Sequence, residues 1–172
     1  GLAETLERLL TPQPETEGFQ EIESLLREAA FDTGNTADLQ AWWLYRMFYS
    51  ANPLIEKLSL FWHNHFATSN AKVRSVPHMA VQNDLFRAEA LGNFRRLLHA
   101  MVKDVAMLIW LDSNANRKRQ ANENFAREVM ELFSLGEGNY TEEDIKQAAR
   151  AFTGWHVRDD QFWFNKRQHD FT

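Results

Sequence analysis

Two histidines, His63 and His65, lie one residue apart in the aromatic stretch FWHNHFATSN at residues 61 to 70. Imidazoles titrate near neutral pH, so this pair could bind a metal ion, transfer protons or serve as two unrelated residues of a core. On a strand, both side chains of a His-x-His pair point to one face, whereas metal-binding pairs on a helix lie three or four residues apart. The chemistry open to this stretch therefore depends on whether it is helical.

The apolar residues around the two histidines have helical periodicity. At about 100° per residue, His65 falls in an apolar stripe that includes Leu58 and Trp62, while His63 points to another side of the helix. We therefore expect His65 to be the inward histidine, and a two-histidine metal site is the weaker interpretation. His65 could be a core residue bonded to a backbone carbonyl, but we expect its partner to be an amide or carboxylate from the QNDLFR or NENFARE segment.

Two carboxylates three residues apart, Glu128 and Glu131, are the next candidates for chemistry. Glu128 lies at the edge of a helical apolar face, near Leu132 and Leu135, where partial desolvation would raise its pKa and suit it to acid–base work. The pair could also share a cation, although the Glu-x-x-His signature of di-iron bundles is absent. An ion-pair ladder of Glu123, Arg127 and Glu131 on the solvated side is expected.

Two further polar residues fall on predicted apolar faces. Asn83 lies on the face of Met79 and Phe86, so its amide should bond to another inward polar group. Arg46 lies among aromatic residues and needs a carboxylate or an aromatic face as its partner. For both residues we favour a structural network.

These candidates must be positioned by helices, because period-two alternation appears only near the C-terminus. The segment after Gly154 predicts a short hairpin with Asp159 and Asp160 at its turn. The sequence thus predicts an all-α fold, an orthogonal bundle of about eight helices in one domain over residues 1 to 172, with a short β-hairpin or extended segment near the C-terminus. The expected helices cover residues 2 to 10, 19 to 30, 37 to 50, 54 to 68, 76 to 90, 93 to 111 with a break near Asp104, 123 to 135 and 142 to 153.

Composition excludes several classes of function. The chain has 172 residues, a net charge of -5 and no cysteine, so disulfides, thiolate metal sites and a broad nucleic-acid surface are not expected. The few clustered cations, Arg117, Lys118 and Arg119, do not reverse that balance. No apolar run approaches the roughly 20 residues of a membrane span, and the sequence reads as soluble with its compartment open between cytoplasm and cell envelope. The motifs of serine hydrolases, zincins, P-loop proteins and dinucleotide-binding proteins are absent.

Four ordered blocks carry a resemblance to a known family. They are LQAWWLYRMFYSANPLIEKLSLFWHNHFATS, QNDLFRAEALGNFRRLLHAMVKDVAMLIWLD, NENFAREVMELFSLGEGNYTEEDIKQAARAFTGW and the closing HD. Over about residues 39 to 170 the chain resembles the bacterial family known as domain of unknown function 1800. Val105 stands directly after Asp104, at a position where the family usually has a proline.

The resemblance brings no established reaction but implies three properties. Family members continue beyond the HD block, so residues 36 to 172 would be the core of a truncated domain, with residues 1 to 35 outside the recognised motifs. Members are commonly encoded beside a second family that resembles secreted phosphatase-like proteins, which implies a partner protein. The family's repeated polar positions correspond to His63, His65, Gln82, Asn83, Arg87, Asp112, Asn122, Glu123, Asn124, Arg127, Glu128, Glu131, Trp155, His169 and Asp170.

Two functions remain in competition. The first is an enzyme-like site that binds a ligand or a divalent metal, most narrowly a metal-assisted hydrolase. The alternative is a non-catalytic interaction or scaffold module of the cell envelope, in which the polar residues form buried networks and the partner protein docks. In the first function Glu128, His65 and His169 would be catalytic, Asn83, Arg87, Asn122 and Arg127 would contact the ligand, and Glu131 and Asp170 would bind the metal.

Overall fold

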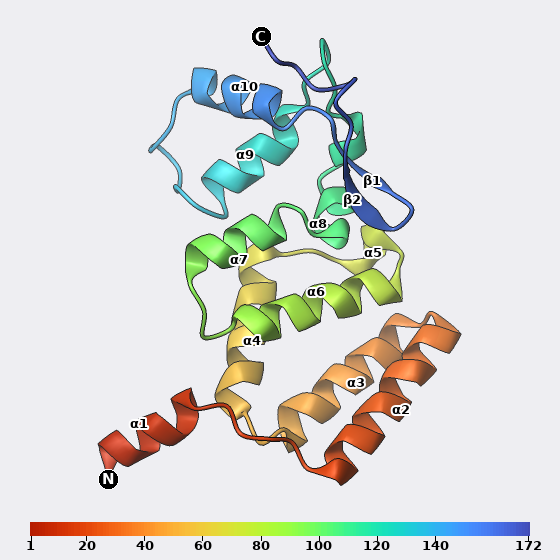
Figure 1. Ribbon diagram of the computed structural model, residues 1–172, viewed down its shortest axis with the longest axis vertical. Coiled ribbons are helices and arrows are strands. Elements are labelled where there is room, and N and C mark those ends of the chain that lie inside the picture. The colour runs from red at the N-terminus through yellow and green to blue at the C-terminus, as the bar shows by residue number, and fades with distance from the viewer.

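Ten α-helices, one short 3₁₀ helix and a two-stranded antiparallel hairpin make up the computed structural model, which describes residues 1–172. The helices follow one another along the long axis, from α1, α2 and α3 at one end to α9 and α10 at the other (Figure 1). The predicted helical class and C-terminal hairpin are confirmed. The elements are α1 Leu2–Leu10, α2 Glu17–Thr33, α3 Thr36–Tyr49, α4 Pro53–Phe66, α5 Asn70–Val73, α6 Val76–Glu89, α7 Phe94–Met101, α8 Val105–Trp110, the 3₁₀ helix Ser113–Ala115, α9 Glu123–Glu131, α10 Glu142–Ala151, β1 Trp155–Arg158 and β2 Gln161–Phe164.

Local capping explains where the helices begin. Asn122 accepts the N–H of Asn124 at the start of α9, and Thr141 forms a reciprocal capping box with Asp144 at the start of α10. Asp104 caps α8 by accepting the N–H of Met107, which splits the predicted helix 93 to 111 into α7 and α8. Pro53 and Pro77 lie in the first turns of α4 and α6, where the missing N–H of proline costs no helical hydrogen bond.

Two elements differ from the prediction. Residues 69 to 73 form a capped turn of helix, α5, because Ser69 accepts the N–H of Ala71. The helix predicted to reach residue 135 ends at Glu131, and the N–H groups of Leu135 and Gly136 both bond to the carbonyl of Met130. Gly136 closes this turn with φ of +80°, a left-handed conformation that glycine adopts readily.

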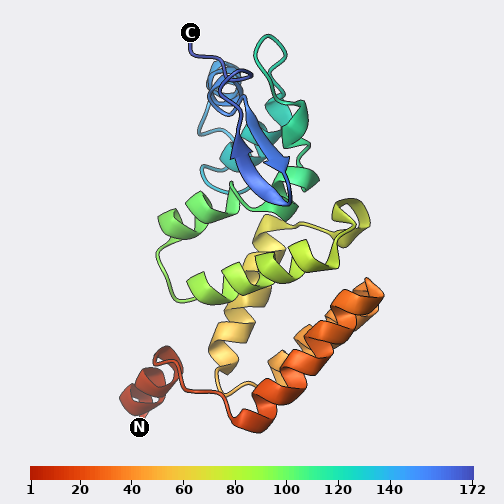
Figure 2. The ribbon, with the colours of Figure 1, turned by 45° about the vertical axis from the view of Figure 1, so that its right-hand side comes forward.

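The main core lies where the C-terminal end of α4 meets α6, α7, α8 and α9. Phe66 is fully buried there and its ring lies 5.9 Å from Phe86 and 5.2 Å from Phe133 between centroids. The hairpin covers one side of this core, and α2 and α3 run side by side at the other end of the molecule (Figure 2). Because Phe66 is held in this core, the orientation of α4 is fixed, and so are the directions in which its other side chains point.

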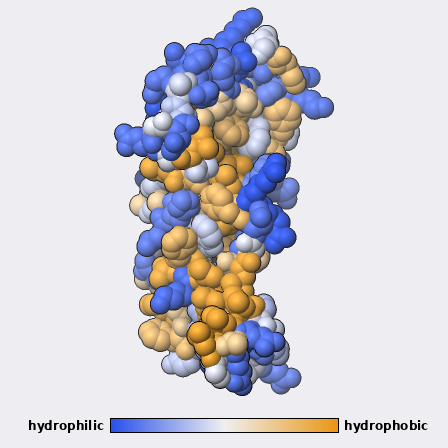
Figure 3. All heavy atoms as spheres, turned by 90° about the vertical axis from the view of Figure 1, so that its left-hand side faces the viewer, coloured by the Kyte–Doolittle hydropathy of each residue, from blue (hydrophilic) through white to orange (hydrophobic).

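An apolar band runs along one long face of the molecule. Figure 3 shows it through the middle and lower parts of this face, on the side of α1, α4 and α7 in Figure 1, with hydrophilic residues at the top. Helix α1 buries none of its residues, so its leucines remain in solvent. None of the helices has the combination of length and apolar character that a membrane crossing requires. Exposed large apolar side chains on these elements are Leu2, Leu6, Leu10, Leu60, Phe61 and Phe94.

The buried cap Asp104 gives a first testable prediction. Its Oδ1 accepts the Gln82 amide at 2.6 Å as well as the Met107 N–H, and burial raises the pKa of Asp104 to about 6. Because the folded pKa is above the unfolded value of 3.8, stability falls as pH rises from about 4 to about 6. Asp104→Asn keeps the acceptor without the charge, so we expect it to be more stable than the wild type by about 1 to 2 kcal/mol above pH 6 and equal to it near pH 4.

Denaturant unfolding at both pH values measures this difference. Asp104→Ala, which loses the cap and leaves the Gln82 amide unpaired, should instead destabilise the chain by about 1 to 3 kcal/mol. An Asp104→Asn variant whose stability matches the wild type at every pH would contradict the expectation.

Candidate functional site

Four residues of the stretch FWHNHFATSN line one cavity between α3, α4, α5 and α6. These residues are His63, Thr68, Ser69 and Asn70. The cavity, called here the His63 cavity, has a volume of about 170 Å³. None of its lining side chains is a carboxylate, a lysine or an arginine. The other lining residues are Thr36, Leu39, Gln40, Trp43, Met79 and Asn83.

The end of α4 brings these four residues together. Ala67 adopts the left-handed conformation and closes α4 by donating its N–H to the His63 carbonyl, which redirects the chain. The loop is then held by side chains, because Thr68 Oγ1 donates to Gln82 and Asn70 Nδ2 donates to Thr36 Oγ1 at 2.8 Å. The cavity wall is therefore a hydrogen-bonded structure.

His63 lines the cavity, and its imidazole is neutral at pH 7. Its ring is half-buried and makes edge contacts with Trp43 and Phe86, at 5.2 and 6.1 Å between centroids. Burial lowers the pKa of His63, because the charged form loses its hydration and gains no carboxylate partner. At neutral pH the ring then offers one hydrogen-bond donor and one acceptor.

Two other polar groups of the cavity are not used by the protein itself. The indole Nε1 of Trp43 is buried and has no hydrogen-bond acceptor. Asn83 Oδ1 accepts Arg87 Nη2, which leaves the two hydrogens of Asn83 Nδ2 without an intramolecular acceptor. The Trp43 N–H is shielded from the open space of the cavity, so the Asn83 Nδ2 hydrogens are the donors that a molecule in the cavity would reach.

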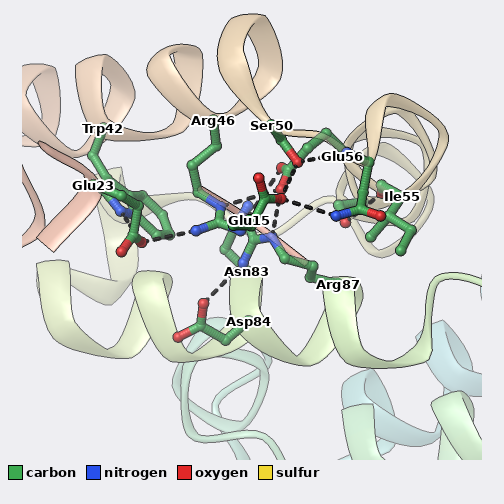
Figure 4. Close-up of polar contacts among 12 residues, drawn as sticks. Glu15, Glu23, Trp42, Arg46, Ser50, Ile55, Glu56, Asn83, Asp84 and Arg87 are labelled. Carbon is green, nitrogen blue, oxygen red and sulfur yellow. Dashed lines mark hydrogen bonds and ion pairs between the residues drawn. The ribbon is translucent and has the colours of Figure 1, made fainter. Parts of the chain in front are cut away.

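Figure 4 shows a separate charged cluster, called here the Glu56 network, to which Asn83 is joined through Arg87. Glu56 is only 2% exposed and bonds both Arg46 and Arg87. Arg46 Nε lies 3.1 Å from Glu56 Oε1, and Arg87 reaches both carboxylate oxygens, at 2.7 and 3.2 Å. The predicted need of Arg46 for a carboxylate or an aromatic face is confirmed, since it also lies over Phe19 and Trp42.

Each further charge of the Glu56 network also has an opposite partner. Arg46 pairs with Glu23 at 2.9 Å, and Asp84 pairs with both Arg87 and Arg27. The network opens to solvent in a cleft of about 550 Å³ but joins α2, α3, α4 and α6. Because the three arginines are paired with Glu23, Glu56 and Asp84, the arrangement ties helices together. Glu15 also lines the cleft, and its carboxylate is held by Ser50, Ala51 and Asn52.

The structure changes the roles expected for the two histidines. His65 Nε2 lies 3.3 Å from the backbone carbonyl of Phe133, so the expected amide or carboxylate partner was wrong. Its ring packs among Trp62, Phe66 and Phe94. His63, which was expected to point away from the interior, faces the cavity instead, because α4 is covered by helices on more than one side.

The other candidate residues are distributed over different parts of the molecule. Asn122 is the cap of α9, and Arg127 pairs with Glu142 at 2.7 Å and with Glu123 at 3.5 Å. Glu131 does not continue the expected ladder but accepts the Tyr140 hydroxyl at 2.6 Å. No group of three His, Asp or Glu side chains has an arrangement that could hold a metal ion.

The remaining candidates lie along α9 and at the C-terminus. Glu128 is half-buried, and its carboxylate makes no hydrogen bond or ion pair; burial and the neighbouring Glu131 raise its pKa. His169 Nδ1 lies 2.7 Å from the Thr153 carbonyl, and the Asp170 N–H donates to Thr153 Oγ1. Asn83 and Arg87 are the only candidates from this set that contact each other directly.

Sequence reasoning did not identify the roles that the structure gives to four residues. Glu56, Ser59 and His63 are spaced as one helical face, so a second, polar buried face of α4 could have been recognised from periodicity. Asn116 is fully buried; its side chain donates to the Ala149 carbonyl and accepts the Asn122 N–H. No pattern distinguishes Asn116 from its neighbouring asparagines in LDSNANRKRQ.

The fold and the cavity define a mainly helical domain with a solvent-open cavity lined by uncharged residues. The chain matches, over residues 1–172, the family model described as "Protein of unknown function (DUF1800)". It therefore belongs to this family, and the match includes the first 35 residues, which carried no recognised motif. No curated protein and no solved structure matches the chain.

Proposed function

We propose that this domain binds a small uncharged polar molecule in the His63 cavity. The observation that carries the proposal is the lining of the cavity, in which the Asn83 amide has free N–H groups and no residue is charged. A ligand with acceptor groups would satisfy these donors. A charged ligand would lose its hydration without gaining a counterion.

The size of the cavity limits which ligands could fit. Its 170 Å³ corresponds to roughly five or six water molecules and is smaller than the ~300 to 1,000 Å³ of pockets for drug-sized ligands. Apolar walls from Leu39, Trp43 and Met79 accompany the hydroxyl and amide groups. A single sugar ring combines apolar C–H faces with hydroxyls that both donate and accept, so a neutral monosaccharide is the ligand class we propose.

Indole N–H resonances offer a direct test. The chain has six tryptophans, and the ¹H–¹⁵N cross-peak that disappears in Trp43→Phe is that of Trp43. With D-glucose or N-acetyl-D-glucosamine added to about 50 mM, enough for millimolar affinity, we expect a saturable shift of this cross-peak. D-glucuronate, a charged counterpart, should shift it much less.

Two features of the chain supply controls. Trp62 Nε1 is also buried and unpaired but packs among aromatic rings, so its cross-peak should not move. Gln40→Ala removes an exposed residue of the cavity rim and should weaken binding about threefold or more, whereas Gln20→Ala, also exposed, should not. If neither neutral sugar shifts the Trp43 cross-peak, or if all six shift alike, the proposal fails.

A metal-assisted hydrolase is the second candidate, and one observation favours it. Glu128 is a half-buried carboxylate with a raised pKa and no partner, as expected for an acid–base group or a metal ligand beside Glu131. Equilibrium dialysis against Mn²⁺ tests it, with Glu128→Gln expected to weaken binding severalfold if the carboxylate is a ligand. Absence of bound Mn²⁺ in the wild type would count against this candidate.

Glu128→Gln also has an expected effect on stability. The raised pKa means that the folded state disfavours the charged carboxylate, so stability falls as pH rises through the folded pKa. The glutamine variant should therefore be as stable as the wild type at pH 4 and slightly more stable at pH 7, by at most about 0.5 kcal/mol because solvent screens the group. Denaturant titrations at the two pH values measure the difference, and a destabilised variant at pH 7 would show that Glu128 has a favourable partner.

The interaction module remains a further candidate, supported by the apolar face of Figure 3. Apolar surfaces of this extent often mark contacts with another protein. Co-expression with the phosphatase-like protein expected to be encoded beside this one tests the interaction module. We expect Leu6→Lys and Phe61→Lys, both at exposed positions, to abolish co-elution, and Glu143→Lys on α10 to preserve it. Co-elution that all three variants retain would exclude this face.

A further inference from the structure

Four cationic side chains gather at the C-terminal end of the molecule, away from the proposed sugar site. Arg117, Lys118, Arg119 and Arg167 line a surface hollow of about 400 Å³, and Gln168 is its one uncharged lining residue. We call it the basic hollow. All four cations are exposed, and none forms an ion pair.

Backbone hydrogen bonds build the hollow from two distant segments. Arg117 and Gln120 exchange backbone hydrogen bonds at 3.3 and 2.9 Å, which closes a tight turn with Lys118 and Arg119 at its tip. The Lys118 N–H donates to the Gln168 carbonyl at 2.7 Å and joins this turn to the C-terminal segment.

That C-terminal segment is itself anchored. Asn165 donates its N–H to Gly154 and accepts the Arg167 N–H on its side-chain oxygen. Gly154 has φ of +81°, and a Cβ there would lie 2.6 Å from the Asn165 carbonyl, so close backbone contact is part of this anchor. The backbones of Arg117, Lys118 and Arg167 are thus held in place, and the Arg117 side chain also donates from Nε to Gln120 Oε1 at 3.1 Å.

The charges that line the hollow favour the binding of an anion. The whole chain has a net charge of -5, yet no carboxylate lines this hollow. The pKa of Asp170 is held below its usual range by hydrogen bonds from Thr172 and more weakly by Lys118, but Asp170 does not line it either. In water, two like charges about 4 Å apart repel each other by roughly 1 kcal/mol. The cations of the hollow therefore repel one another, whereas a bound anion would attract each of them.

We infer that the basic hollow binds a small soluble anion with two or more phosphate or sulfate groups. Three arginines offer planar forks that match the oxygens of such groups two at a time, and Lys118 adds a point charge. A nucleic acid fits less well, because no aromatic side chain lines the hollow for base stacking and the rest of the chain is acidic.

Calorimetric titration of the full chain with inorganic pyrophosphate tests the inference. We expect one saturable site with a Kd below about 1 mM at low salt, weakening at least fivefold at physiological ionic strength because salt screens exposed charges. Arg119→Ala and Arg167→Ala should each weaken binding about fivefold or more. Both positions are exposed, so the variants should fold.

Arg95→Ala is the matched control, because Arg95 is exposed, unpaired and on α7. It removes the same charge and should change the affinity by less than about twofold. The inference is overturned if pyrophosphate shows no saturable binding or if Arg95→Ala weakens it as much as Arg167→Ala. It is also overturned if a single-stranded 12-nucleotide DNA binds about tenfold more tightly than pyrophosphate, since that would identify a nucleic-acid surface.

Discussion

Replacing Glu56 by Ala is expected to lower the free energy of unfolding by about 3 to 5 kcal/mol, the usual cost of removing one partner from a buried ion pair. Glu56 is 2% exposed and is the shared acceptor of Arg46 and Arg87. Without it, two guanidinium groups would remain partly buried and lose their central counter-charge. Urea unfolding followed by circular dichroism measures the loss as a shift of the midpoint with an unchanged slope.

Two further variants separate charge from shape. Glu56→Gln keeps the side-chain volume and one acceptor oxygen, so it should recover part of the loss but not all of it. Glu142→Ala breaks the surface pair with Arg127 and should change stability little, because surface pairs contribute little. If Glu56→Ala were as stable as Glu142→Ala, the Glu56 network would not be what joins α2, α3, α4 and α6.

Phe66→Ala is expected to cost about 3 to 5 kcal/mol, the range for removing a buried aromatic ring. Phe66 is fully buried, at the last position of α4, with Phe86 and Phe133 against its ring. Truncation would leave a cavity at the point where α4, α6 and the turn after α9 meet. The loss has both a transfer component and a cavity component, since neighbouring rings can only partly collapse into the space.

Phe48→Ala is the matched control for this experiment. Phe48 is 77% exposed, so its truncation should leave the unfolding midpoint within about 0.5 kcal/mol of the wild type. Thermal and urea unfolding of both variants measure the difference. A loss of less than about 1 kcal/mol in Phe66→Ala would mean that the core is loosely packed around this ring.

The positions of most helices followed from local chemistry and were predictable. Helices α9 and α10 begin at residues 123 and 142 as predicted, with Asn122 and Thr141 as their caps, and the break appears near Asp104 as predicted. These features depend on neighbours a few residues apart, which is the information that periodicity and capping residues contain. The end of α9 was less predictable, because its last turn is decided by hydrogen bonds to the Met130 carbonyl.

The candidate site was less predictable than the fold. Helical phase separated His63 from His65 correctly, but it could not say which face of α4 would meet which neighbour. His65 turned toward a backbone carbonyl at Phe133, which sequence patterns cannot identify because every residue has one. The unpaired indole of Trp43 is likewise invisible in sequence, since an absent partner is a property of the surroundings.

The sequence alone determined the helical class, the C-terminal hairpin, most helix starts and the need of Arg46 and Asn83 for buried partners. The tertiary structure decided that Glu56 supplies the partner for Arg46, that His63 lines a cavity, and that Gln168 joins the turn at Lys118. The physical reason is the range of the interactions. Caps and periodicity act within one or two helical turns, whereas a cavity or a charge cluster depends on the packing of segments far apart in the chain.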